Sequence, residues 1–291
     1  MMLRTLSLLM IFGAYGMLPA QDGGAVFRSD VRLVEVYATV FDHHGHYLDG
    51  LKGNNFELRD EGMPQPIVSF ESNTSTLSCA ILLDTTGSMF RALPAVKNAV
   101  LHLIDDFRLE DSIAIYSFST SLEVLQDFSS DKSALKTAVL RTRAAGETAL
   151  FDSISQAAAA IAKRSGKKAM IVFTDGDDNA SVLNASAALS RVKKLGIPIY
   201  TIAEGEAVES AALGRGLKEI SQVTGGMPFA VKKAKDIETF FGYISEELQH
   251  GYMLTYKPPA AKGFGWRKIE LVLNDGPKDT RIRAREGYLP E

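Results

Sequence analysis

Three oxygen-bearing side chains occupy alternate positions just after a short apolar run. The run, residues 80–83, has the sequence AILL, and Asp84, Thr86 and Ser88 follow it. An apolar run of this length bounded by turn residues predicts a buried strand. The alternate spacing allows the three donors of the following loop to converge on one point. Carboxylate and hydroxyl oxygens are hard donors that suit magnesium, manganese or calcium.

Two later segments supply the oxygen donors that this loop lacks for a complete metal site. Residues 167–175, KKAMIVFTD, predict a second buried strand that ends in an aspartate, and residues 146–151, GETALF, place a threonine just before an alanine-rich helical stretch. Ligands of an open parallel sheet gather at the carboxyl ends of its strands. We therefore expect one metal site with five ligands: Asp84, Thr86, Ser88, Thr148 and Asp175.

A purely structural role for these five residues is the alternative. The two aspartates could cap the loops and helices after their strands, with the hydroxyls serving as helix N-caps. This alternative explains each residue separately but not their joint arrangement, so metal binding is the favoured interpretation. Replacing Asp84 or Ser88 by alanine is expected to abolish metal-dependent binding and to leave the fold largely intact, because loops tolerate change.

The ordered set resembles the metal-ion-dependent adhesion site of the von Willebrand factor type A domain. That pattern is Asp-x-Ser-x-Ser, then a threonine, then an aspartate, and Thr86 replaces the first serine here while keeping the hydroxyl. The resemblance covers roughly residues 77–249. It implies that the three hydroxyl residues are direct ligands and that the two aspartates often act through water.

The same resemblance implies how the site would bind a partner. An octahedral magnesium site needs about six oxygens, and hydroxyls and waters neutralise the ion less than carboxylates do. An aspartate or glutamate of a protein ligand could then complete the sphere around Mg²⁺, or around Mn²⁺ or Ca²⁺. The residues expected to contact this partner are Gly87, Met89, Glu147 and Asp177.

We therefore predict a binding and adhesion module that is not an enzyme, with two alternatives. One is a metal-dependent phosphohydrolase that uses Asp84 as its nucleophile. The loop, however, offers hydroxyls in place of a second carboxylate, and the chain has no Gly-rich lysine loop for nucleotides. The other alternative is a metal-independent structural module of an envelope assembly.

Composition excludes several other classes of protein. The chain has 291 residues, 46% of them hydrophobic, which is sufficient for an ordinary buried core. A net charge of -3 with mixed signs gives no basic field for nucleic acid. Neither a nucleic acid nor a nucleotide is an expected partner.

The first twenty residues predict export. Residues 1–20 contain a basic Arg4, an apolar stretch from 6 to 18 and a small Ala20. This pattern is typical of a secretory signal peptide cleaved near Ala20, and an uncleaved membrane tether is the alternative. The expected location is therefore periplasmic, cell-envelope or extracellular.

The pattern of the remaining chain changes twice. Residues 26–75 alternate like short β-strands, residues 77–250 alternate strands with helices, and residues 251–291 return to strands. The middle part predicts a doubly wound, mostly parallel α/β sheet, Rossmann-like as in a type A domain. Because each outer group is too small to be stable alone, we expect both to join in one β-sandwich that carries the inserted domain.

The outer parts also resemble a known group. The segments DHHGHYLDGL, FELRDEGMPQPIVSF and RIRAREGY are similar to those of bacterial VWFA-related proteins common in acidobacteria. That resemblance implies an exported protein.

Overall fold

The computed structural model describes residues 33–233, 236–260, 265–274 and 279–290. The expected signal peptide, residues 1–20, and the possible membrane tether lie outside these residues. In the described part of the chain, no helix has both the length and the apolar character needed to cross a membrane.

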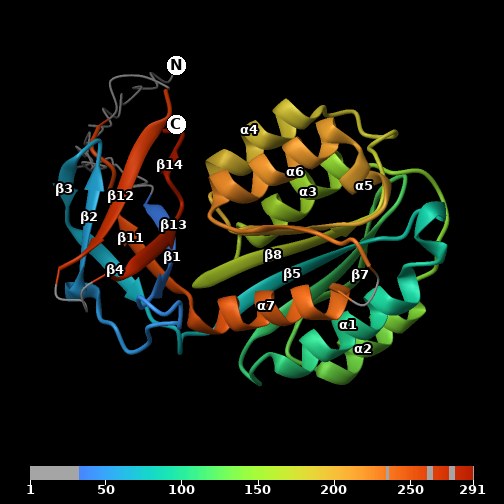
Figure 1. Ribbon diagram of the computed structural model, residues 1–291, viewed down its shortest axis with the longest axis horizontal. Coiled ribbons are helices and arrows are strands. Elements are labelled where there is room, and N and C mark those ends of the chain that lie inside the picture. The colour runs from blue at the N-terminus through green and yellow to red at the C-terminus, as the bar shows by residue number, and fades with distance from the viewer. Residues whose placement is uncertain (1–32, 234–235, 261–264, 275–278, 291) are drawn as a thin grey trace, which may run out of the picture. The chain divides into compact units, whose positions relative to one another are not determined.

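A six-stranded sheet forms the centre of the segment in which strands and helices alternate (Figure 1). Its strands are β5 (Leu77–Asp84), β6 (Ser112–Phe118), β7 (Leu122–Ser129), β8 (Lys167–Thr174), β9 (Ile199–Ala203) and β10 (Pro228–Ala230). The order is β10-β9-β8-β5-β6-β7, and all neighbours are parallel except β6 and β7. The predicted α/β fold class is thus confirmed, and β5 and β8 lie side by side.

Helices cover both faces of this sheet, as Figure 1 shows. They are α1 (Leu93–Asp106), α2 (Lys132–Arg141), α3 (Leu150–Ile161), α4 (Ala185–Leu195), α5 (Glu206–Glu209), α6 (Ala211–Thr224) and α7 (Asp236–His250). Successive strand residues point to opposite faces. Ile81 and Leu83 therefore pack with α1, α2 and α7, whereas Ala80 and Leu82 pack with α3, α4 and α6.

Local chemistry sets the ends of α4 and α6. Asn184 and Ser210 accept hydrogen bonds from backbone N–H groups in the first turns of these helices, which satisfies donors that the helix leaves unpaired. Both helices end at a glycine in the left-handed region, Gly196 with φ 64° and Gly225 with φ 86°. The short α5 was not predicted, because four residues are too few to show a helical period.

The two ends of the chain form two antiparallel four-stranded sheets, ordered β13-β1-β11-β4 and β14-β12-β2-β3. A short 3-10 turn, η1 (Gly53–Asn55), precedes β2. The strands are β1 (Val34–Phe41), β2 (Phe56–Asp60), β3 (Met63–Gln65), β4 (Ile67–Glu71), β11 (Tyr252–Tyr256), β12 (Arg267–Leu273), β13 (Arg281–Ala284) and β14 (Gly287–Tyr288). Val34 pairs with Tyr256, and Ala38 pairs with Ala284. The expected joining of the amino-terminal and carboxyl-terminal strands is confirmed.

A buried ionic network lies between these two sheets, which we call the β-sandwich. Asp60 is fully buried and accepts hydrogen bonds of 2.9 Å from the hydroxyls of both Tyr256 and Tyr288. Its other oxygen accepts a 2.8 Å hydrogen bond from Arg267 Nε. A buried carboxylate is tolerated only when it is paired and hydrogen-bonded, and this network meets both conditions.

Two connecting segments, which we call the crossings, link the α/β segment to the β-sandwich: the first lies between β4 and β5, and the second between α7 and β11. Side chains of the α/β segment form hydrogen bonds with both. Lys167 Nζ donates to the carbonyl of Gly251 at 2.9 Å and to those of Ser72 and Asn73 at 3.3 and 3.4 Å. Arg108 donates to the next two carbonyls of the first crossing. Backbone carbonyls that the crossings leave outside regular structure are thereby paired.

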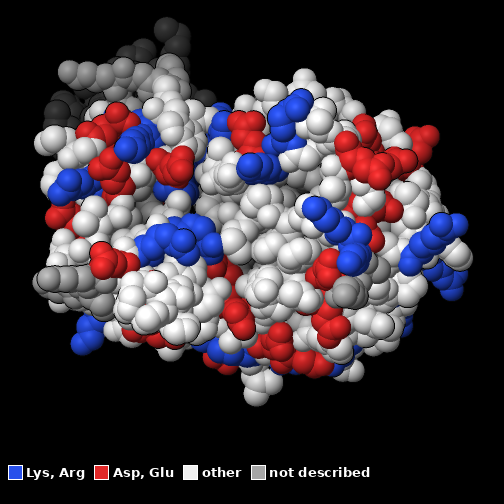
Figure 2. Space-filling view, viewed as in Figure 1, with Lys and Arg blue, Asp and Glu red and all other residues white. Residues whose placement is uncertain are grey.

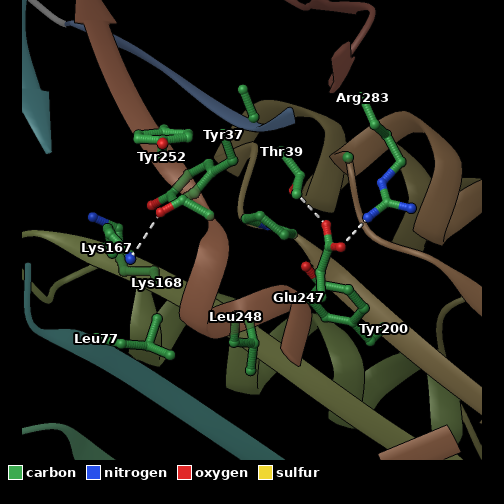
Figure 3. Close-up of a pocket in the computed structure, with 14 residues that line it drawn as sticks. Tyr37, Thr39, Leu77, Lys167, Lys168, Tyr200, Glu247, Leu248, Tyr252 and Arg283 are labelled. Carbon is green, nitrogen blue, oxygen red and sulfur yellow. Dashed lines mark hydrogen bonds and ion pairs between the residues drawn. The ribbon is translucent and has the colours of Figure 1, made fainter. Parts of the chain in front are cut away.

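Glu247 of α7 adds a contact between this helix and the β-sandwich (Figure 3). It is 3% exposed, accepts a hydrogen bond from the Thr39 hydroxyl and forms an ion pair with Arg283. Tyr37 and Tyr200 line a cavity of about 30 Å³ beside it. A space of this size holds about two water molecules.

Arg285, which follows β13, places its guanidinium against the end of α4 and its backbone against the end of α6. The guanidinium donates to the carbonyls of Gly287, Glu35 and Lys193 at 2.8, 3.1 and 3.4 Å. A Cβ added to Gly196 would lie 1.7 Å from Arg285 Nη1. Burial lowers the pKa of Arg285 to about 10, but the negative end of the α4 dipole favours the cation there.

Charged side chains of both signs are interspersed on the face shown in Figure 2. That face has no continuous field of Lys and Arg, in keeping with the net charge of -3. Nucleic-acid binding requires such a field, so this face does not support it.

Candidate metal centre

The three segments with the expected ligands meet at the carboxyl edge of β5 and β8. Asp84 is the last residue of β5, and Asp175 directly follows β8. A single 3-10 turn, η2 (Gly87–Phe90), carries Ser88. The loop before α3 is tied to the first segment, because Ala145 N–H donates to the carbonyl of Thr85 at 2.7 Å.

A chain of hydrogen bonds links the hydroxyls to a carboxylate. The Thr86 and Ser88 hydroxyl oxygens lie 3.0 Å apart, and Ser88 Oγ donates to Asp175 Oδ1 at 2.8 Å. A Cβ added to Gly176 would lie 3.7 Å from both Ser88 Oγ and Thr148 Oγ1. The Thr148 hydroxyl therefore faces the same point as the others, and donors from all three segments converge.

Asp84 differs from the other four because both of its oxygens are already used. Its side chain is fully buried. Oδ1 accepts the backbone N–H of Thr86 at 2.9 Å, and Oδ2 accepts the hydroxyl of Thr174 at 2.7 Å. Burial raises the pKa of Asp84 to about 6, and these hydrogen bonds oppose the rise.

Among the residues that the structure describes, no positive group lowers the pKa of either aspartate. Burial raises the pKa of Asp175, and the charge of Asp175 contributes to the raised pKa of Asp84. A divalent cation would relieve both effects, since it favours ionised carboxylates. Among the described residues, no three His, Cys, Asp or Glu side chains converge as a metal cluster, so hydroxyls must supply the remaining donors. Two aspartates with three hydroxyls form such a set and fit a hard cation.

The family model for the von Willebrand factor type A domain matches residues 79–242. The chain belongs to this family. The resemblance inferred from the sequence is thereby confirmed, and the matched residues contain all five expected ligands. No curated protein matches the sequence.

Solved structures with the same fold are distant in sequence. A von Willebrand factor type A protein from Catenulispora acidiphila has a TM-score of 0.55 at 15% identity, over 80% of this chain and 73% of that one. The PilB minor pilin from Streptococcus sanguinis has a TM-score of 0.51 at 16% identity, over 64% and 63%. Proximal thread matrix protein 1 from the mussel byssus, with a zinc-occupied MIDAS motif, has 0.53 at 18%, over 64% and 48%. This chain thus spans under two thirds of the latter two proteins.

Two residues of the loop after β8 fix the backbone at Thr148 and at the start of α3 by hydrogen bonds. Neither role was predicted from the sequence. Asn179 Oδ1 accepts the N–H of Thr148 at 2.8 Å, and its own N–H donates to the Thr148 carbonyl at 3.0 Å. Asp178 accepts the N–H of Phe151 at 2.8 Å, at the start of α3. The turn-rich GDDN sequence signals a loop, but it does not reveal which strand end that loop touches.

The structure corrects one expected partner contact of the type A domain. The Met89 side chain is fully buried and packs in the core beneath α1. The η2 turn points this apolar side chain inward, so it cannot contact a partner. Gly87, Glu147 and Asp177 are exposed, and their contact with a partner stays a prediction.

Proposed function

We propose that the type A domain binds a protein partner through a divalent cation, with Thr86, Ser88 and Thr148 as ligands. Asp84 and Asp175 would act through water. The observation that carries the proposal is the hydrogen-bonded chain from Thr86 through Ser88 to Asp175, which gathers oxygens of two segments beside the Thr148 hydroxyl. When bound, the cation would supply an electrophilic centre for an aspartate or glutamate of the partner.

Access to the site supports this role. Gly87 and Ser88 are exposed, whereas Asp84, Thr86 and Thr148 are buried. A cation held here would have protein oxygens on its inner side and an outer side open to solvent. Magnesium is the favoured cation because hydroxyls and waters suit its small octahedral shell, with manganese or calcium as substitutes.

The position of Asp84 argues against phosphohydrolase activity. A nucleophilic carboxylate needs an accessible oxygen. Both oxygens of Asp84 accept hydrogen bonds from the protein, and the side chain is fully buried. The domain is therefore proposed to be a binding module without enzymatic activity.

Export forms part of the proposal. The basic and apolar pattern of residues 1–20 supports secretion or attachment to the cell envelope. The partner is then expected among envelope or extracellular proteins.

A capture experiment tests the proposed function. Immobilised full-length protein is incubated with envelope extract in Mg²⁺ or in EDTA, with Ser88→Ala as the control. We expect capture that requires Mg²⁺, fails with the variant and is lost when the carboxylates of the extract are amidated with a carbodiimide and an amine. Capture that persists in EDTA would support the structural-module alternative, and Mg²⁺-dependent hydrolysis of p-nitrophenyl phosphate would support the enzyme.

A further inference from the structure

Glu204 lies next to the proposed metal site but belongs to none of the three segments that supply its expected ligands. It directly follows β9, the strand that pairs with β8. Its N–H donates to the carbonyl of Thr174 at 3.0 Å, and Ala207 N–H donates to the carbonyl of Asp175 at 3.1 Å. The turn that begins at Glu204 therefore packs on the backbone of Asp175.

The second residue of this turn, Gly205, has a backbone conformation that favours glycine. Gly205 has φ 54°, and a Cβ added there would lie 3.2 Å from the carbonyl oxygen of Asp175. Gly205 thus permits a close approach that a larger residue would hinder. The approach keeps Glu204 beside the metal site.

One oxygen of the Glu204 carboxylate has no hydrogen-bond partner in the described part of the chain. Its Oε2 atom is buried, and no group of the described residues pairs with it. Burial and then the charge of Asp175 raise the pKa of Glu204. A buried oxygen without a hydrogen-bond partner lowers stability by about 1–3 kcal/mol. A bound ion or water that pairs with the oxygen would offset this cost.

Glu204 is not positioned as a further direct carboxylate ligand. In the described part of the chain, Glu204 forms no metal cluster with Asp84 and Asp175. Backbone hydrogen bonds hold the turn of Glu204 against Thr174 and Asp175, and the charge of Asp175 acts on the Glu204 carboxylate. A water bound to the cation would be a donor that could reach it.

We propose that Glu204 is a positioning residue of the metal site, whose buried carboxylate oxygen accepts a hydrogen bond from a water on the cation near Asp175. This inference rests on the proposed function. Outer partners of this kind orient the inner shell, and their loss lowers metal affinity about 10- to 100-fold. Glu204 thus adds a third strand end, that of β9, to the site.

Calorimetric titration with Mg²⁺ and with Mn²⁺ tests the proposal on the full chain. The variants are Glu204→Gln and, as a matched control, Glu206→Gln. Glu206 is exposed and also raises the pKa of Asp175 through its charge, so the control removes the same charge without a buried oxygen. We expect Glu204→Gln to lower the affinity for both cations about 10-fold or more. We expect Glu206→Gln to lower these affinities much less.

Melting in EDTA separates this role from a structural one. Because Glu204→Gln removes the charge from a half-buried carboxylate with one buried, unpaired oxygen, the variant should melt in EDTA at the same temperature as the wild type or higher. Its melting temperature should rise less than that of the wild type when Mg²⁺ is added. Equal cation affinities for the two variants, or a lower melting temperature in EDTA with unchanged affinity, would overturn the proposal. A wild-type chain that binds neither cation would instead overturn the proposed function itself.

Discussion

Ser88 Oγ lies 2.8 Å from Asp175 Oδ1, although 87 positions separate the two residues in the sequence. The contact joins a turn after β5 to the residue after β8. Because the single Ser88 hydroxyl hydrogen goes to Asp175, the Thr86 hydroxyl donates to Ser88, and one lone pair of Ser88 stays available for a cation. The geometry of this pair therefore makes Ser88 the most direct test of the site.

Ser88→Ala should lower Mg²⁺ affinity at least about 10-fold and change the free energy of unfolding by about 1 kcal/mol or less, because the residue is exposed. Calorimetry and urea denaturation in EDTA measure the two effects. Asp84→Ala should lose affinity too but destabilise the fold by about 1–3 kcal/mol, since it removes the acceptor of the Thr86 N–H and leaves the Thr174 hydroxyl with only the longer contact to the Gly176 carbonyl at 3.4 Å. An Asp84→Ala variant as stable as Ser88→Ala would contradict this distinction.

Mg²⁺ should stabilise the wild type against heat. At a concentration of about 100 times Kd, binding to the folded state alone contributes about 2.7 kcal/mol, which corresponds to an increase of several degrees in Tm. EDTA should reverse the increase. At the same Mg²⁺ concentration, a Ser88→Ala variant with about 10-fold lower affinity should gain about 1.4 kcal/mol, which is about half of the wild-type effect, and less if its affinity is lower still. An identical increase in Tm for the wild type and the variant would mean that the cation binds at another site.

Gly196→Ala should destabilise the protein more than Gly45→Ala. Both glycines have positive φ, 64° and 86°, so both variants carry the same kind of backbone strain. Only at Gly196 would the new Cβ meet the Arg285 guanidinium, whereas nothing lies within 4 Å at Gly45. We expect a difference of about 1–3 kcal/mol in the free energy of unfolding. Equal losses in urea denaturation would show that Arg285 moves aside without cost.

Lys167 should make the stability depend on alkaline pH. Burial lowers its pKa to about 8 in the folded state, against about 10.4 in the unfolded chain. The unfolded state therefore binds more protons between these values, and the free energy of unfolding should rise with pH from about 8 to 10.4 by up to about 3 kcal/mol. Below pH 8 both states are protonated and the cost of the buried cation is fully present.

The comparison with Lys167→Met isolates this effect, because all other titrating groups are shared. Urea denaturation at pH 7, 8, 9 and 10 under reducing conditions should show the wild type gaining stability relative to the variant. A constant difference across this range would mean that the Lys167 amine keeps an ordinary pKa.

The sequence predicted the parts of the site that depend on strand ends. Asp84, Ser88 and Asp175 follow apolar runs, and an α/β topology brings the ends of such runs together. Met89 was assigned to the wrong environment because its direction depends on the η2 turn and not on its neighbours in the sequence. Glu204 and Asn179 were not recognised since their roles depend on which strands become adjacent.

The outer strands could be recognised by alternation, but the residues that connect them to the α/β segment could not. Arg285 shows no pattern that would indicate its packing against two helix ends. The predicted domain boundaries stay a prediction: residues 26–75 and 251–291 as the two halves of one β-sandwich, and residues 77–250 as the type A domain inserted between them.

The pairing of Val34 with Tyr256 also has a consequence for the order in which the chain acquires its structure. During synthesis, β1 and β4 leave the ribosome more than a hundred residues before their partner strands β11 and β13 exist, whereas β2 and β3 can pair with each other at once. The type A domain between them can fold first, and its folding brings Glu71 and Met253, which pair across β4 and β11, close together. The inserted domain thereby shortens an otherwise slow loop closure, and until then the early strands expose unpaired edges that a chaperone would have to protect.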